Sequence, residues 1–177
     1  MHAITPSQIN PLPNYFDKYI LLAEDESIAN NFQRRLSELQ QVPIAEWLQI
    51  GNRIYAENKW TITDILQHII DCERIFCYRA LCFSREEKAA MLSFDEDEYA
   101  IKAKASERKL QDVILELETV RKSAISLFAS FNNRMLQQEG KSFFGSYSVA
   151  SIAFIIVGHQ RWHFRVIQER YMPLLST

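Results

Sequence analysis

Residues that break helices are scarce in this sequence. Only four of its 177 residues are glycine and five are proline, and three of the prolines fall within the first thirteen residues. Long stretches therefore contain nothing that would end a helix. Because 47% of the residues are hydrophobic, the chain can bury a core of its own. We expect a single, mostly helical domain over residues 1–177, with residues 1–13 as an extended N-terminal arm.

Other absences exclude several classes of function. No basic block is present and the net charge is -2, so nucleic-acid binding lacks its electrostatic basis. No apolar run is long enough to span a membrane, and no basic region followed by an apolar core marks a secretory signal peptide. The three cysteines, Cys72, Cys77 and Cys82, are five residues apart in one expected helix and cannot easily pair there. We therefore expect reduced thiols in a cytoplasmic protein.

The spacing of apolar residues predicts four long helices. Thr61 and Asp64 form a capping box before the second helix, and Ser106 and Ser148 are the expected N-caps of the third and fourth. The four helices are expected at about residues 25–41, 62–83, 107–131 and 149–171.

The segments between these helices are expected to be irregular. Phe94–Tyr99 is acidic and is expected to be a loop, and Asn132–Tyr147, which contains two glycines, is expected to be a long connection. The last helix is apolar over most of its circumference before Gly158, so it should be central and buried. Four helices that share a core predict an all-α four-helix bundle, in which metal sites are built from side chains on facing helices.

Three of the four histidines stand where a metal ion can bind them. His159 and His163 are four residues apart, so they lie one turn apart on the same helix face. His68 belongs to the apolar stripe of the second helix. Three imidazoles would leave open positions on the ion, as is usual for catalytic zinc. The alternative is that the histidines are structural, each satisfied by a single hydrogen-bond partner.

Residues beside these histidines are further candidates. Asp71 is a candidate to orient an imidazole or to hold a metal-bound water, and the alternative is a solvated helix residue. Cys72 is a possible fourth ligand, although we favour a small buried hydrophobic role for it. Gly158 allows a close backbone approach or extra room at the site, or else serves simple helix packing.

Three motifs resemble those of the DinB-like, or DinB/YfiT-like, metalloenzymes. They are Trp60–Arg74 with its continuation Tyr78–Leu81, the acidic segment Phe94–Asp97, and Val157–His163 in the last helix. The resemblance extends over about residues 14–173 in order and spacing. It implies a four-helix bundle that holds a divalent metal, usually nickel or zinc.

Carried over residue by residue, the resemblance implies that His68, His159 and His163 are the metal ligands. Many members of the family have a further histidine next to the last one, whereas Trp162 and Phe164 flank His163 here. This departure puts a histidine-based proton relay in doubt. The family also often forms homodimers. Its members of established activity are transferases or isomerases that use a low-molecular-weight thiol, and many others are labelled hydrolases.

These observations favour a metal-dependent enzyme with a small-molecule substrate. The same three-histidine site serves thiol transfer and hydrolysis, and we favour thiol transfer slightly. Candidates to bind an anionic thiol are Arg53, Arg74, Arg79 and Arg161. The first alternative is a non-catalytic metal-binding module of the stress response on the same scaffold. The second is a plain helical bundle without a metal. Three imidazoles accept zinc, nickel, iron or copper, so the sequence does not choose the metal.

Overall fold

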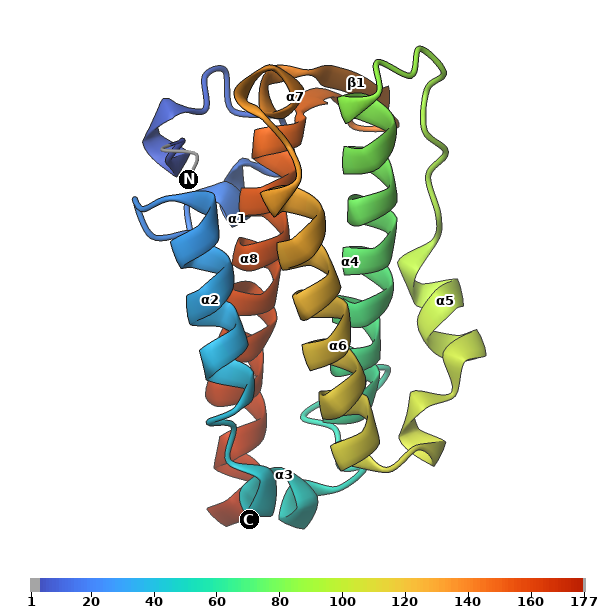
Figure 1. Ribbon diagram of the computed structural model, residues 1–177. Coiled ribbons are helices and arrows are strands. Elements are labelled where there is room, and N and C mark those ends of the chain that lie inside the picture. Colours follow the sequence, from blue (N-terminus) through green and yellow to red (C-terminus); the bar gives the residue numbers. More distant parts are fainter. Residues whose placement is uncertain (1–3, 177) are drawn as a thin grey trace.

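Four long helices form the body of the molecule in a computed structural model that describes residues 4–176 (Figure 1). They are α2 (Ile28–Leu39), α4 (Ile62–Ser84), α6 (Leu110–Ala129) and α8 (Val149–Val166). Helices α6 and α8 each pack against both α2 and α4. The predicted all-α four-helix bundle is confirmed. Residues 1–3 of the expected arm, and residue 177, lie outside the described part.

Shorter elements lie at the two ends and along the sides of the bundle. They are α1 (Asp17–Ile20), α3 (Ile44–Ile50), α5 (Glu96–Ala103), α7 (Asn133–Gln137), β1 (Glu139–Ser142) and β2 (Gly145–Ser148). The strands pair in an antiparallel hairpin beside α7 at one end, and α3 lies at the other end (Figure 1). Helix α5 runs along the outer side of α4. No helix of the described residues is both long and apolar enough to cross a bilayer.

Two segments expected to be irregular contain regular structure. The acidic segment starts helix α5, because the Asp95 carboxylate accepts the main-chain N–H groups of Asp97 and Glu98 and so caps the helix. Negative charge in a first turn is also favoured by the helix dipole. The expected connection 132–147 folds into α7 and the hairpin, where Gly145 takes a positive φ of 106° at the turn.

The capping predictions hold at two of the three helices for which they were made. The Thr61 hydroxyl accepts from the Asp64 N–H, and the Asp64 carboxylate accepts from the Thr61 N–H. The Ser148 hydroxyl accepts the Ser151 N–H and so caps α8. The prediction for Ser106 is wrong, since α6 begins at Leu110. Instead the Ser106 N–H donates to the Asp64 carboxylate at 3.2 Å, so this residue ties the chain to the start of α4.

Helix ends also shift by a few residues. Helix α2 begins at Ile28, because the Ser27 side chain accepts the N–H of Asn30. Helix α8 ends at Val166 and passes into a π-helical turn that ends at Tyr171.

The histidines separate two apolar clusters in the core. On the face of α4 that carries His68, Ile65 precedes the histidine and belongs to one cluster, whereas Phe76 follows it and belongs to the other. On α8, Ile156 belongs to the same cluster as Phe76, and Ile167 belongs to the same cluster as Ile65. The other two histidines lie between Ile156 and Ile167. The bundle therefore contains a polar layer in the middle of an otherwise apolar core.

Candidate metal centre

Facing helices bring the three predicted histidines together. The Nε2 atom of His159 on α8 lies 3.0 Å from Nε2 of His68 on α4 and 3.0 Å from Nε2 of His163. The ring centroids of His68 and His163 are 4.8 Å apart. Two nitrogens that share an ion at about 2.0–2.1 Å lie roughly 3.0–3.4 Å apart, depending on the coordination angle. The nitrogen of His159 is therefore spaced from each of the other two as ligands of one ion would be.

The imidazoles are held neutral by their surroundings. His68 and His159 are 6% and 5% exposed. Burial lowers the pKa of His68 to about 4, and burial together with His68 lowers that of His163 to about 3. Burial, and the two neighbouring rings, push the pKa of His159 well below its usual range. At neutral pH each ring therefore keeps a nitrogen lone pair that can bind a metal.

Helix α1 reaches the site because of Gly158. A Cβ atom at this position would lie 1.8 Å from the Tyr19 carbonyl oxygen, so only glycine admits this backbone approach. The approach sets the Tyr19 ring edge-on to His159, with ring centroids 5.2 Å apart. On the other side, the Trp60 ring packs 4.8 Å from His68. Of the roles considered for Gly158, the structure shows the close backbone approach.

Cys72 is closer to the histidines than the sequence suggested. Its Sγ lies 3.7 Å from both ring nitrogens of His68, and potential ligand atoms of His68, Cys72 and His159 all lie within 4.8 Å of one another. The side chain is buried, and burial raises the pKa of its thiol. Cys72 is therefore buried, as the sequence predicted, and its sulfur is also close enough to bind a metal at this site.

The polar contacts that the structure gives for Asp71 are with side chains other than the three histidines. Its carboxylate accepts from the Gln67 amide at 3.0 Å and lies 4.0 Å from the Arg74 guanidinium. Burial raises the pKa of this carboxyl. A role for Asp71 beside the metal stays a prediction that these contacts do not support.

A cavity of about 250 Å³ adjoins the histidines and includes His159 and Cys72 in its wall. Its lining is largely aromatic, from Tyr15, Phe16, Tyr19, Phe76, Phe94, Phe143 and Phe144. Arg79 and Glu96 add charge, and partial burial, with Asp97 beside it, raises the pKa of Glu96. Except for Phe76 on α4, these aromatic residues come from α1 and the residues just before it, the turn of the hairpin and the loop before α5. No local pattern in the sequence places them at the site.

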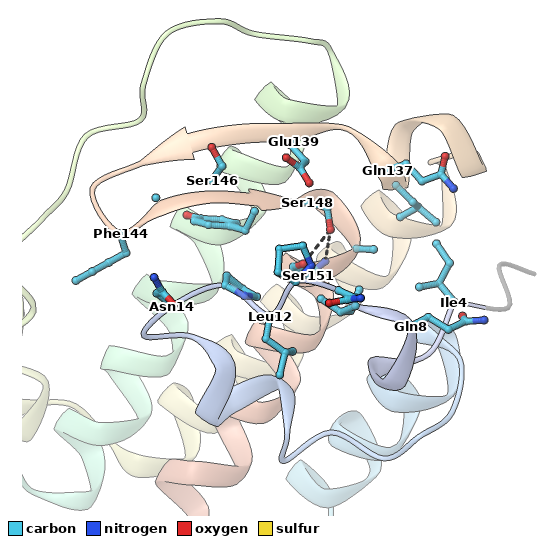
Figure 2. A pocket seen from close by; sticks show the side chains of 18 residues that line it. Ile4, Gln8, Leu12, Asn14, Gln137, Glu139, Phe144, Ser146, Ser148 and Ser151 are labelled. Carbon is cyan, nitrogen blue, oxygen red and sulfur yellow. Dashed lines mark hydrogen bonds between the residues drawn. The ribbon is translucent and has the colours of Figure 1, made fainter.

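A larger hollow of about 710 Å³ lies between the N-terminal arm and the hairpin (Figure 2). Ser148 and Ser151, at the start of α8, hydrogen-bond to each other in its wall. The residues that line it include no histidine or cysteine, and Glu139 supplies the one carboxylate among them. Of the candidate ligands, His159 and Cys72 line the smaller cavity, whereas His163 lines a separate cavity of about 250 Å³.

Fold and site together define a helical bundle with a candidate metal centre in its core. The sequence profile of the DinB superfamily matches residues 28–167, and the chain belongs to this superfamily. Its fold is similar to that of YfiT from Bacillus subtilis, described as a probable metal-dependent hydrolase with an unusual four-helix bundle topology. The likeness covers 98% of this chain and 91% of that chain, with a TM-score of 0.67 and 15% identity. No curated protein matches the chain.

Proposed function

We propose that this protein is a divalent-metal-dependent hydrolase of small molecules. Its ion would be held by His68, His159 and His163. The observation that carries the proposal is the convergence of three neutral imidazoles, of which His159 lines a cavity. The description of YfiT as a probable metal-dependent hydrolase adds support at the level of the fold.

The donor set fits a divalent ion of the late transition series. Imidazole nitrogen suits zinc, nickel, copper and iron, and zinc or nickel is the expected metal because the family resemblance implies it. Three imidazoles buried together would be costly without a partner, and a metal would take up one lone pair from each. Cys72 offers a sulfur at the same place.

When bound, a divalent ion supplies a Lewis acid that activates a water or a thiol at neutral pH. The protein's own residues would do the rest. The aromatic walls of the cavity would exclude bulk water and pack an apolar substrate. The Glu96 carboxyl, with its raised pKa, is the group in the cavity wall best suited to exchange a proton with a substrate.

The cavity favours hydrolysis over the thiol transfer that the sequence slightly favoured. A small substrate and a water fit a cavity of about 250 Å³, whereas a tripeptide-sized thiol would extend outside it. Thiol transfer is the second candidate, supported by the Arg79 guanidinium in the wall, which would attract an anionic thiol.

Metal analysis and turnover test the proposal. We expect purified protein to bind one equivalent of zinc or nickel, and His68→Ala and His159→Ala to lose it. Cys77→Ser and Cys82→Ser are matched controls, because these side chains lie outside the ligand group, and they should keep the metal. Failure of the wild-type protein to bind a metal would refute the proposal.

Activity is measured on the metal-loaded protein with two panels. Small aryl esters and amides report hydrolysis, and monochlorobimane with small thiols reports thiol transfer. Chelator-sensitive ester or amide turnover, lost in His159→Ala, is the expected result. A chelator-sensitive rate with thiols alone would select thiol transfer instead. A metal bound without either rate would select the non-catalytic module. The cytoplasmic location and the homodimer stay predictions.

A further inference from the structure

Four arginines were candidates to bind an anion, and the fold separates one of them from the rest. Arg74 and Arg161 pair with carboxylates, and Arg53 donates to main-chain carbonyl groups. Arg79 alone of the four lines the cavity that contains His159.

The Arg79 side chain is a buried cation without a counter-ion. It is 5% exposed, and none of the ion pairs within residues 4–176 includes it. One terminal nitrogen donates to the Leu92 carbonyl at 2.8 Å, and the other reaches the Tyr147 hydroxyl only at 3.5 Å. The guanidinium carbon lies 5.7 Å from the centre of the Phe76 ring. Its charge is therefore only partly compensated by the protein.

A buried charge that lacks a partner is costly, so its retention beside a cavity indicates that something else supplies the opposite charge. A guanidinium presents a planar fork of N–H donors that matches a carboxylate. Along α4, Arg79 is seven residues beyond Cys72, which amounts to about 10 Å of helix rise. Phe76 lies between Cys72 and Arg79 on this helix, and like both of them it lines the cavity.

Resting on the proposed function, we propose that Arg79 binds the carboxylate of the substrate, so that the enzyme acts on small carboxylic acids with an apolar body. The carboxylate would lie at Arg79, the apolar body against the aromatic walls, and the reacting group toward His159. The proposal concerns this chain's own cation and does not depend on which metal is bound.

Two acidic side chains in the same wall define the competing possibility. The Asp95 carboxylate accepts two main-chain N–H groups at the start of α5, so its charge is already engaged. Glu96 is only partly buried and has Lys18 as a charged neighbour. If these two carboxylates outweighed the charge of Arg79, the cavity would bind amines more tightly than acids.

The test compares three probes of nearly equal size: phenylacetate, phenylacetamide and phenethylamine. Each is titrated into isotope-labelled protein, metal-free and zinc-loaded, with the amide signals of Phe76–Ala80 and the Arg79 Nε–H signal as readouts. In wild-type protein we expect phenylacetate to bind roughly 10- to 100-fold more tightly than the amide, as for a charge-assisted hydrogen bond. Equal binding of acid and amide, or tightest binding of the amine, would overturn the proposal.

Variants then assign the preference to one side chain. Arg79→Gln should abolish the preference for the acid, and Arg79→Lys should restore part of it. Arg74→Gln is the matched control on the same helix and should leave it unchanged. Because wild-type selectivity needs no variant, an unfolded variant does not spoil the test. The preference for the acid over the amide in metal-free protein tests the role of Arg79 even where the metal proposal fails. Acid binding that requires zinc and persists in Arg79→Gln would refute that role.

Discussion

Acid should destabilise the metal-free protein through its buried imidazoles. In the folded state the pKa of His68 is about 4 and that of His163 about 3, whereas a histidine of the unfolded chain titrates near about 6.5. Below this value the unfolded state takes up protons that the folded state does not. The stabilisation is therefore fully present above about pH 6.5 and is lost as the pH falls toward the folded-state values.

The size of the loss follows from these pKa values. Linkage between a pKa of about 6.5 and one of about 4 lowers the free energy of unfolding by about 2 kcal/mol between about pH 7 and pH 5. His163 contributes a similar amount over the same interval. The two together remove about 4 kcal/mol, a large part of the roughly 5–15 kcal/mol that stabilises a typical domain.

Urea unfolding followed by circular dichroism, in the presence of a chelator, measures this effect at the two pH values. His68→Gln removes one titrating group, so its loss between the two conditions should be about 2 kcal/mol smaller than that of the wild type. Ile69→Val is the matched control, because this neighbour is also buried but does not titrate. It should cost about 0.5–1.5 kcal/mol equally at both values. An identical acid-dependent loss in wild type and His68→Gln would refute the reasoning.

Three further changes test the scaffold. Gly158→Ala forces a Cβ against the Tyr19 carbonyl. It should lower stability by about 1–3 kcal/mol in thermal unfolding and weaken zinc binding; unchanged values would show that α1 moves freely. Glu73→Gln removes the carboxylate bound to the fully buried Arg121, with an expected loss of about 3–5 kcal/mol in urea; a neutral effect would contradict this. Thr61→Ala removes an N-cap and should cost about 1 kcal/mol, unless the helix start rearranges.

Local patterns predicted the parts of this protein that depend on neighbours in sequence. Helices α4 and α8 and their caps follow from apolar spacing and from side chains three residues away. The same spacing predicted that His159 and His163 share a face. Ser106 failed as a cap because it lies within a short 3-10 turn, Ala105–Glu107, and its N–H is bound by Asp64, forty-two residues earlier, so that α6 begins only at Leu110. The acidic segment before α5 formed a helix because Asp95 caps it.

The sequence by itself therefore determined the helical class and the identity of the three converging imidazoles, because helix periodicity is written in residues a few positions apart. Only the tertiary structure decided what surrounds them. It brought Cys72 to within 3.7 Å of His68 and Tyr19 against His159. It also left Arg79 without a counter-ion in a wall built from α4, α1, the hairpin and the loop before α5. Such contacts join segments far apart in the chain, and their distances depend on packing that no local pattern records.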